Sequence, residues 1–401
     1  MFFFKLINLL IMSSGVTIVG AGVTKFGKRT DVSYRDLMAE AIVEAINSTN
    51  GEIEPKDIDG LYVAASQPEL LVDQAHVGNL AAQVAGITPN IVSRVEMACA
   101  SGSAAMRNAW AANKSGLADT ILLVGLEKMT HNARVASRGL CLVPDVENEA
   151  IHGITAYSGF ALAAKMHMKE YGTTREQMSS VAVKNHYNAA RNPKAQFHEM
   201  GEITLEKAIN SKMVSEPFNL FDCSPLTDGA SAVIITRSDL AKNYTDQPIQ
   251  ILGSGQSTEP SIGVSNMKSI TEWHALKRAA KSAYEMANKT PSDIQVAETH
   301  DCFTIAEIIE YEDLGFTPKG QGGKFIEEGE SHLDGSLPIN TSGGLKAKGH
   351  PIGATGLAQI TEIVNQLRGN AGKRQVADVN VGLTHNLSGF ATHHVIHILG
   401  N

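Results

Sequence analysis

The stretch "CASGSAAMRNAWAANKSGLADTILLVG" (residues 99–125) has the pattern of a helix that begins with small residues and is followed by a β-strand. A second stretch, "HPIGATGLAQITEIVNQLRGNAGKRQVADVNVG" (residues 350–382), follows the same plan. Cys99 in the first stretch falls opposite His350 in the second. One α/β unit that occurs twice predicts a duplicated fold, in which a site between the halves draws residues from both.

The elements that precede these two stretches repeat as well. "VTIVGAG" (16–22) and "IQILGSG" (249–255) are β-branched runs that end in a glycine turn. Helical patterns follow at 34–46 and 271–287, and alanine or leucine recurs in both at every fourth position. This spacing predicts one narrow packing face on each helix.

The distance along the chain between equivalent positions is nearly constant. Gly20 and Gly253 are 233 residues apart, and Pro55 and Pro291, which begin turns into predicted strands, are 236 apart. We therefore expect an α/β protein whose two related sheets have helices packed between them. We predict an N-terminal extension at residues 1–13, followed by an N-terminal half in two parts, 14–127 and 229–246. A loop domain without the repeated pattern, 128–228, separates these two parts, and the C-terminal half covers 247–401.

Composition limits the class of protein. The chain has 401 residues, of which 43% are hydrophobic and 19% charged, as in a soluble globular enzyme. Its formal net charge of −8 argues against a nucleic-acid partner, which would require a basic stripe. The four cysteines are widely spaced and form no CxxC pair, so we expect reduced thiols in the cytoplasm, without a metal or a disulfide framework.

The N-terminal segment "MFFFKLINLLIM" (1–12) is apolar but shorter than the roughly 20 residues of a membrane span. It has no basic region before the apolar run and no signal-type cleavage site after it. We expect an upstream extension with the working start at Met12 and no stable membrane span. A weak signal or a membrane-surface segment is the alternative.

Cys99 is the first candidate for chemistry. At a helix start, a thiol lies near the positive end of the helix dipole, which lowers its pKa and predicts a reactive thiolate. The small residues that follow it leave room for a substrate. A packed and inert cysteine is the alternative on pattern alone.

Two further segments carry candidate side chains. In "ETHDCFTIAE" (298–307), His300 and Cys302 are two residues apart, so they point the same way from an extended strand. In "NTSGGLKAKGHPIGATG" (340–356), a glycine-rich loop leads to His350 at the predicted start of a helix. Incidental polar residues at a strand end and an exposed histidine in a turn are the alternatives.

Neither glycine-rich segment fits a nucleotide-binding motif. Residues 340–356 lack the GK[ST] of a P-loop, and "GAGVTKFG" (20–27) lacks the third glycine of a dinucleotide turn. A local basic cluster holds Lys184, Arg191 and Lys194. It is either a solvated helix face or a patch that meets the phosphates of a ligand.

The segments "ACASGSAA", "HDCF" and "GHPIGATG" resemble three signature segments of the thiolase superfamily. "HDCF" in particular resembles the sterol-carrier-protein-type thiolases and their archaeal acetoacetyl-CoA thiolase relatives, as do "NPKAQF" and "FDCSPLTDGASAVI" (221–234). The resemblance covers residues 14–400, with the segments in the family's order. It implies the thiolase fold: duplicated βαβαβαββ halves in a five-layered αβαβα arrangement, with an inserted loop domain that covers coenzyme A.

The resemblance also implies a role for each candidate. Cys99 would be the nucleophile that takes an acyl group from a coenzyme A thioester. Cys302 would be the general acid/base at the α-carbon of the second acetyl-CoA. His350 would help to activate Cys99 and, with His300, would bind the thioester oxygen in an oxyanion hole. Coenzyme A thioesters are then the substrates, and no metal or redox cofactor is required.

Further substrate contacts are implied at five residues: Ser254, Phe303, Gly344, Lys184 and Arg191. One segment departs from the family pattern, because "THNLSGFATHHVIHIL" (384–399) keeps a single glycine, Gly389, where the family has several in a row. That loop normally supplies a backbone N–H to a second oxyanion hole, beside the N–H of Cys99. The bulkier residues of this chain leave the preferred acyl length open.

The resemblance favours an acetyl-CoA C-acetyltransferase, which condenses two acetyl-CoA to acetoacetyl-CoA or runs the reverse thiolysis. A thiolase for longer 3-ketoacyl-CoA and a thiolase-like scaffold with little turnover are the alternatives. A decarboxylating ketoacyl synthase fits less well, since it has no use for Cys302. The archaeal-type likeness further implies a homodimer or a dimer of dimers. It also implies a complex with hydroxymethylglutaryl-CoA synthase and a small bridging protein, in the mevalonate route to isoprenoids, which would draw off the product.

Overall fold

The computed structural model describes residues 15–50 and 53–401, so the predictions for the N-terminal extension and for Met12 lie outside the described residues. Nine strands pair edge to edge in one sheet. In order across this sheet, the strands are β3 (Ile91–Val95), β2 (Gly60–Ala64), β4 (Thr120–Glu127), β7 (Gly229–Arg237), β1 (Val16–Val23), β8 (Ile249–Thr258), β11 (His393–Gly400), β10 (Val381–Ser388) and β9 (Val296–Glu298).

The strand order shows the predicted duplication. The strands β3, β2, β4, β7 and β1 come from the N-terminal half, and β8, β11, β10 and β9 come from the C-terminal half. In both halves the first strand is antiparallel to the last, and the inner pairs, β2 with β4 and β9 with β10, are parallel. Only two residue pairs, Thr17 with Gln250 and Ile18 with Ile249, join β1 to β8. The two related sheets are therefore present, linked at one edge.

The halves differ at their outer edges. β3 pairs with β2 along its whole length, whereas the equivalent segment of the C-terminal half makes one parallel bridge, between Ile339 and Ala297. The predicted βαβαβαββ order therefore holds in the N-terminal half, and the third strand of the C-terminal half is reduced to a single bridge. After Ile339 the chain leaves the sheet and enters the glycine-rich loop that leads to His350.

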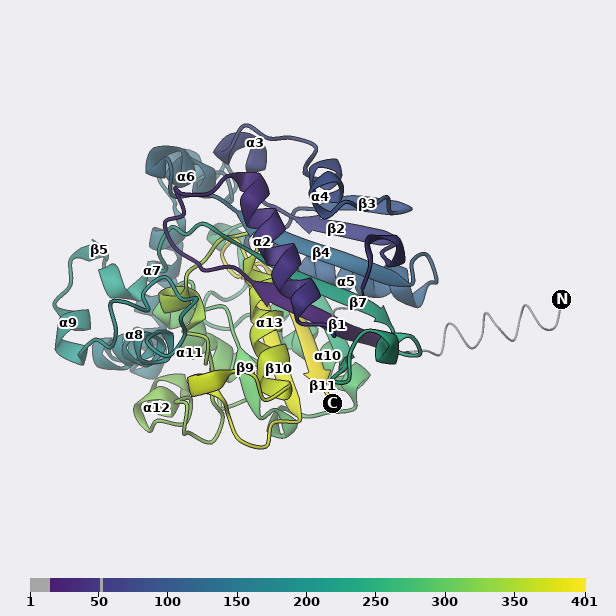
Figure 1. Cartoon of the computed structure of the whole chain (residues 1–401). Coiled ribbons are helices and arrows are strands. Elements are labelled where there is room, and N and C mark those ends of the chain that lie inside the picture. The colour runs from purple at the N-terminus through teal and green to yellow at the C-terminus, as the bar shows by residue number, and fades with distance from the viewer. Residues whose placement is uncertain (1–14, 51–52) are drawn as a thin grey trace.

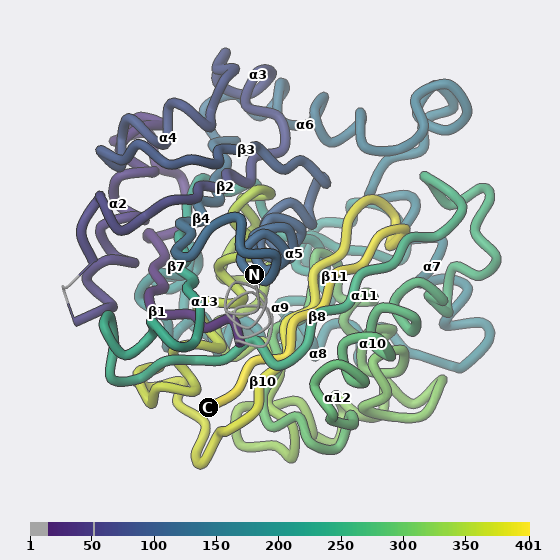
Figure 2. The backbone as a smooth tube through the Cα atoms, turned by 90° about the vertical axis from the view of Figure 1, so that its right-hand side faces the viewer, coloured from purple at the N-terminus to yellow at the C-terminus, as the bar shows by residue number. Residues whose placement is uncertain are grey.

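The helices complete the five layers that the resemblance implies. α5 (Ser101–Lys114) and α13 (Thr355–Leu367) contact strands of both halves and form the central layer. α2 (Tyr34–Asn47) packs on β1 and β7 outside one half, and α10 (His274–Ala287) packs on β8 and β11 outside the other (Figure 1). The side view of Figure 2 shows β8, β11 and β10 together, with α10 beside them.

The two central helices cross at glycines. A Cβ on Gly102 would lie 2.9 Å from the backbone nitrogen of Gly356, and a Cβ on Gly356 would collide with Ser103. Only glycine permits so close an approach of two backbones. The crossing brings the N-terminal ends of both helices together, and with them the segments that carry Cys99 and His350.

The remaining helices lie mostly to one side of the sheet. They include α6, α7, α8 and α9 with the hairpin of β5 and β6, and they sit beside α11 and α12 (Figure 1). Their bounds are α6 Ala133–Leu140, α7 Ala156–Tyr171, α8 Arg175–Ala189, α9 Leu205–Ile209, β5 Met213–Ser215, β6 Phe218–Asn219, α11 Thr304–Asp313 and α12 Gly322–Glu327. The short helices α3 (Pro68–Leu71) and α4 (Val77–Ala85) follow β2.

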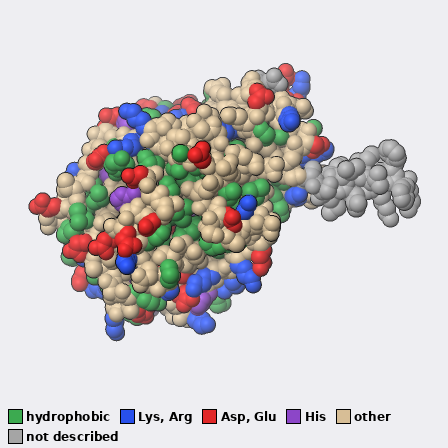
Figure 3. Space-filling view, turned by 90° about the horizontal axis from the view of Figure 1, so that it is seen from below, with side chains coloured by type: hydrophobic (Ala, Val, Ile, Leu, Met, Phe, Trp, Pro, Cys, Tyr) green, Lys and Arg blue, Asp and Glu red, His purple; other side chains and the backbone are tan. Residues whose placement is uncertain are grey.

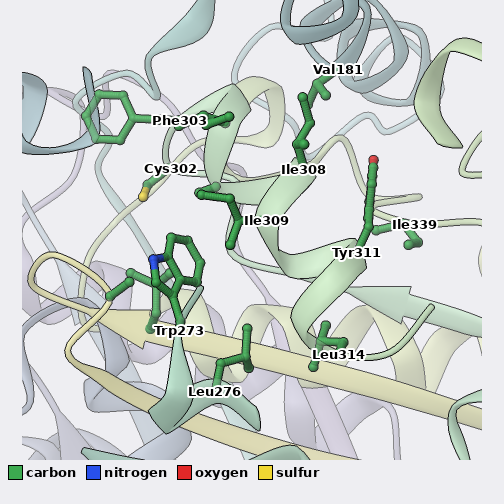
Figure 4. Close-up of a cluster of buried hydrophobic side chains, with 14 of the residues drawn as sticks. Val181, Trp273, Leu276, Cys302, Phe303, Ile308, Ile309, Tyr311, Leu314 and Ile339 are labelled. Atoms are coloured by element: carbon green, nitrogen blue, oxygen red, sulfur yellow. The ribbon is translucent and has the colours of Figure 1, made fainter. Parts of the chain in front are cut away.

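A large buried hydrophobic cluster surrounds α11. Figure 4 shows Ile309 of this helix and Leu314, which follows it, together with Trp273, and the cluster also includes Cys302 and Phe303, just ahead of the helix. The core therefore fixes the segment that carries the second candidate cysteine. On the face drawn in Figure 3, positive and negative side chains are interspersed. Within the described ranges, no helix combines the length and the apolar character that a membrane crossing needs.

Candidate active site

Cys99 lies in a single 3-10 turn, Ala98–Ala100, between β3 and α5. Ala98 has a φ of +41°, a backbone conformation that residues other than glycine rarely adopt. Ser101 holds the turn, because its Oγ accepts the N–H of Met97 and donates to the carbonyl of Ala98. This strained turn places Cys99 immediately before α5, as the pattern predicts.

His300 follows β9 after one residue. Its backbone N–H donates to Glu310 Oε2 at 3.0 Å, and its Nδ1 lies 2.7 Å from the side-chain nitrogen of Asn386. Because that amide nitrogen is a donor, Nδ1 accepts, and the proton of a neutral imidazole resides on Nε2. Nε2 has no hydrogen-bond partner among the described residues, so its N–H is available to a substrate oxygen.

His350 has the opposite tautomer. The hydroxyl of Thr355 donates to the carbonyl of Pro351, so its oxygen accepts the proton of His350 Nδ1, 2.6 Å away. The lone pair of His350 is therefore on Nε2, which also lacks a partner among the residues described. α13 begins at Thr355, five residues later than the sequence predicts, so His350 lies in the turn before the helix.

Both imidazoles are neutral in the resting protein. Burial lowers the pKa of His350 to about 3, with a further contribution from Lys348. Burial also lowers the pKa of His300 well below its ordinary value, and the neighbouring His350 adds to this effect. One ring is therefore a hydrogen-bond donor and the other a base, without either carrying a charge.

Cys99 Sγ and one nitrogen of each of these two rings lie within 4.8 Å of one another. The rings of His300 and His350 meet edge to face, with 5.0 Å between their centroids. A thiol, a base and a donor thus converge at one point. Three such atoms are also the number of protein ligands in a catalytic zinc site, and the expectation that no metal binds here stays a prediction.

A cavity of about 60 Å³ adjoins this point. Cys302, Phe303 and Gly389 line it with the three converging residues, and most of its remaining wall is apolar: Met129, Leu140, Ala156, Tyr157, Phe160, Leu226, Ile352 and Leu387. Phe303 stacks on Phe160, with 4.8 Å between ring centroids. A buried water needs about 10–15 Å³ of such volume, so the cavity has room for an acyl group of a few atoms.

Cys302 is a neutral thiol in this environment. Burial raises its pKa well above the ordinary value, and the nearby Cys99, Glu310 and Asp301 raise it further. The segment is held in place by the carbonyl of Cys302, which accepts the N–H of Ser224 at 3.0 Å. A thiol with a raised pKa becomes a strong base once its proton has left, as proton abstraction from carbon requires.

The expected low pKa of Cys99 is wrong. Burial raises the pKa of this thiol to about 12, and the carboxylates of Glu127 and Glu96 contribute in the same direction. The hydrogen bond from the backbone at the helix start lowers the pKa, but this effect is smaller than the cost of removing a thiolate from water. Cys99 therefore needs a base during the reaction, and His350 Nε2 is the available one.

Lys184 does not reach the cavity, which corrects the prediction that it contacts substrate phosphates. Its ammonium group is buried, forms an ion pair with Glu307 and donates to the carbonyl of Ile339 at 2.9 Å. Arg191 is paired with Glu202 at 2.9 Å and lines a different cavity. The basic cluster of the sequence is thus divided between a structural ion pair and a second cavity.

Ser254 and Gly344 are also absent from the active-site cavity. Ser254 is buried on β8, where its Oγ accepts a hydrogen bond from Arg107 at 2.9 Å. Gly344 packs against Asp301, whose carboxylate would collide with a Cβ at position 344. Both residues are buried and tightly packed outside that cavity, and their predicted contacts with the substrate stay predictions.

Four residues that position the site were not singled out from the sequence: Asp301, Glu310, Thr355 and Asn386. Asp301 accepts the backbone N–H groups of Leu345 and Lys346, at 2.6 and 3.0 Å, and so joins the two segments that carry the histidines. Three of the four lie within or beside the quoted motifs. Only the folded chain shows what each one contacts: a ring nitrogen for Thr355 and Asn386, and backbone N–H groups for Asp301 and Glu310.

Comparisons with known proteins agree with this geometry. The family profile of the thiolase N-terminal domain matches residues 16–239, and that of the thiolase C-terminal domain-like family matches residues 255–401. An acetyl-CoA acetyltransferase of Methanothermobacter thermautotrophicus is 45% identical over 383 residues, which cover 96% of this chain and 98% of that protein. An acetyl-CoA acetyltransferase of Methanocaldococcus jannaschii is 42% identical, with 96% and 99% covered. Among solved structures, an Ltp2-ChsH2(DUF35) aldolase matches with a TM-score of 0.83 at 28% identity, covering 97% of this chain and 98% of that one.

Proposed function

The chain belongs to the thiolase family and is an acyltransferase, and on that premise we propose that it is an acetyl-CoA C-acetyltransferase. It condenses two acetyl-CoA to acetoacetyl-CoA and coenzyme A through an acyl-cysteine, and it catalyses the reverse thiolysis. The observation that carries the proposal is the convergence of Cys99, His300 and His350 within 4.8 Å, beside Cys302.

Acylation begins with the neutral thiol of Cys99. His350 Nε2, held as an acceptor by Thr355, takes the thiol proton as Sγ attacks the thioester carbonyl carbon. The oxygen that gains charge is stabilised by the Nε2–H of His300. The thiol of Cys302 then protonates the departing coenzyme A sulfur, which leaves acetyl-Cys99, a Cys302 thiolate and a His350 imidazolium.

Condensation uses the charges left by acylation. The Cys302 thiolate removes a proton from the α-carbon of the second acetyl-CoA, and the resulting carbanion attacks the acetyl carbonyl on Cys99. The bond between that carbonyl and Cys99 Sγ breaks, and His350 returns its proton to the thiolate. Acetoacetyl-CoA leaves, and all three groups regain their resting protonation states.

The size of the cavity supports an acetyl group as the preferred acyl unit. Its volume is about 60 Å³, and Tyr157, Phe160 and Leu387 close its apolar wall. Two relatives that cover nearly the whole chain are named as acetyl-CoA acetyltransferases. A longer 3-ketoacyl chain would need these side chains to move.

The proposal extends to assembly and context: a homodimer or dimer of dimers in the cytoplasm, acting in the mevalonate route without a cofactor. β3 is an edge strand that pairs with β2 alone, and Val92 on it is 36% exposed, so a second copy has a strand to pair with. Condensation is uphill, which favours a complex with hydroxymethylglutaryl-CoA synthase and a small bridging protein that consumes the product. The matching structure of Ltp2 with ChsH2(DUF35) is named as a two-protein assembly.

A steady-state assay tests the proposal with three substrates: acetyl-CoA, acetoacetyl-CoA and a long 3-ketoacyl-CoA. We expect thiolysis of acetoacetyl-CoA and slow condensation of acetyl-CoA. A preference for the long substrate would instead identify a thiolase of lipid breakdown. No turnover of any of the three would identify a scaffold subunit.

A further inference from the structure

A second, larger cavity lies away from the catalytic residues. Its volume is about 750 Å³, and none of Cys99, His300, Cys302 or His350 lines it. Its walls come from β1 and α2, from the 190–198 segment, from α13 and from the 370–374 turn. Figure 1 shows α2, β1 and α13 near the centre of the view.

The lining of this cavity is basic in an acidic protein. Five Lys or Arg side chains and two Glu side chains line it, whereas the whole chain has a formal net charge of −8. Arg374 is bonded to Glu362 and Lys194 to Glu44, so each of the two carboxylates is already paired with a cation. Arg191 is paired with Glu202 and Lys348 lies 3.5 Å from Glu298, so within the described residues Lys373 is the lining cation without a carboxylate partner.

Lys348 is a buried cation in the lining whose ammonium group has unused hydrogen-bonding capacity. Its side chain is buried, its residue being 4% exposed, and its ammonium nitrogen makes no hydrogen bond to any described residue. The nearest carboxylate oxygen, on Glu298, is 3.5 Å away. A buried ammonium group without a hydrogen bond is costly, so it favours an anion that supplies one.

Lys373 lies in the lining on the 370–374 turn, and it is exposed. No ion pair or hydrogen bond of its side chain is found within the described part of the chain. Val23, Phe26 and Ala358 pack together and give the cavity an apolar wall as well. Cations with an apolar wall, in a volume of this size, fit a nucleotide-sized ligand.

We propose that this cavity binds a small molecule with at least two linked phosphate groups, such as a nucleoside diphosphate, and that Lys348 and Lys373 contact the phosphates. Lysine is a common phosphate ligand in proteins, and it acts there as a point charge that needs no fixed geometry.

Two connections join this cavity to the catalytic centre. Lys348 is two residues before His350 in the same loop. Gln196, in the 190–198 segment, donates its backbone N–H to the carbonyl of Lys348 and accepts a hydrogen bond from the Thr227 hydroxyl. Thr227 Oγ1 in turn accepts the backbone N–H of His350 at 2.9 Å. A ligand that binds Lys348 therefore contacts the loop that positions the catalytic base, His350.

Titration calorimetry on the full chain tests the proposal, with inorganic pyrophosphate and ADP as separate probes. We expect at least one of the two to bind wild-type protein. Lys373→Ala and Lys348→Met should each weaken that binding by about tenfold or more, since each removes a charge-assisted contact. Lys281→Ala is the matched control, because Lys281 is an exposed lysine on α10, away from the cavity, and it should bind as wild type does.

A competition experiment separates this cavity from the coenzyme A site. Saturating coenzyme A should leave the binding of the probe unchanged, and Cys99→Ala should bind it normally. The proposal is overturned if neither probe binds, if coenzyme A displaces the probe, or if Lys281→Ala weakens binding as much as Lys373→Ala does. Lys373 is exposed, so a loss of binding in Lys373→Ala does not arise from a loss of folding.

Discussion

The start of α5 and the start of α13 are equivalent positions of a duplicated fold, yet they carry different chemistry. The first presents Cys99 from a strained turn at Ala98, held mainly by Ser101. The second presents His350 from a glycine-rich loop, with its tautomer set by Thr355. The duplication brings the two positions together, the side chains Cys99 and His350 give them different chemistry, and the local hydrogen bonds hold each side chain in place.

The two halves also share the work unequally. The N-terminal half contributes Cys99, whereas His300, Cys302 and His350 all come from the C-terminal half. The segments that carry these three residues are braced by buried carboxylates, with Asp301 accepting from the 340–350 loop and Glu310 accepting from His300. The C-terminal half positions three catalytic side chains relative to one another, and these buried hydrogen bonds fix the segments that carry them.

The substitution with the largest expected effect removes Cys99, the catalytic side chain that the N-terminal half contributes. Cys99→Ala should lower kcat/KM for acetoacetyl-CoA thiolysis by at least about 10⁴-fold, because no other thiol in the cavity is placed to attack. Cys141→Ser is the control, since Cys141 is half-buried at the end of α6 and outside the cavity. Residual activity near that of the control would show that Cys99 is a packed residue.

A second substitution breaks the buried ion pair between Lys184 and Glu307, which stabilises the C-terminal half. Lys184→Met leaves Glu307 buried without its cation, and breaking a buried ion pair in this way costs about 3–5 kcal/mol of unfolding free energy. Urea denaturation measures this loss. Lys324→Met, which breaks an exposed pair with Glu328, should cost less than about 1 kcal/mol. Equal losses in both variants would show that Lys184 does not brace the site.

A substitution that changes the tautomer of His350 should have a smaller effect on activity, and it tests the role of Thr355 at the start of α13. Thr355→Val removes the acceptor of the Nδ1 proton with little change in volume. The imidazole then loses the preference that keeps its lone pair on Nε2, and kcat should fall by about 10- to 100-fold. Thr361→Val, on the same helix but facing the second cavity, is the matched control. A normal kcat in Thr355→Val would mean that another group takes the thiol proton.

The pH dependence of alkylation gives the smallest effect and tests the resting state of Cys99. Its raised pKa, about 12, means that the thiolate fraction increases with pH throughout the neutral range. The rate of labelling by iodoacetamide should therefore rise by about tenfold per pH unit between pH 7 and 9. Mass spectrometry of the labelled peptide measures this rate. A plateau near pH 7 would restore the low pKa that the helix position suggests.

Much of the architecture could be predicted from the sequence, because the pairs Gly20 with Gly253 and Pro55 with Pro291 preserve the spacing of the duplicated unit. The converging residues were found for a related reason, since their motifs lie at equivalent ends of repeated elements. The predicted lowering of the Cys99 pKa was wrong, because a sequence shows the position at a helix start but not the burial that raises the pKa. Lys184 was misplaced for the same reason: its partner, Glu307, is far away along the chain.

The central claim is that two thiols, one from each half, divide the reaction: Cys99 carries the acetyl group, and Cys302 moves the α-proton. The most direct measurement combines intact-mass detection of the acetyl adduct with a condensation assay on Cys302→Ser. We expect this variant still to become acetylated on Cys99, because the nucleophile, the base and the oxyanion donor remain in place and the coenzyme A thiolate can leave without a proton from residue 302. Condensation should fall by about 10²- to 10⁴-fold, since a serine hydroxyl is a far poorer carbon base than a thiolate. Condensation close to the wild-type rate, or a variant that cannot be acetylated, would contradict this division.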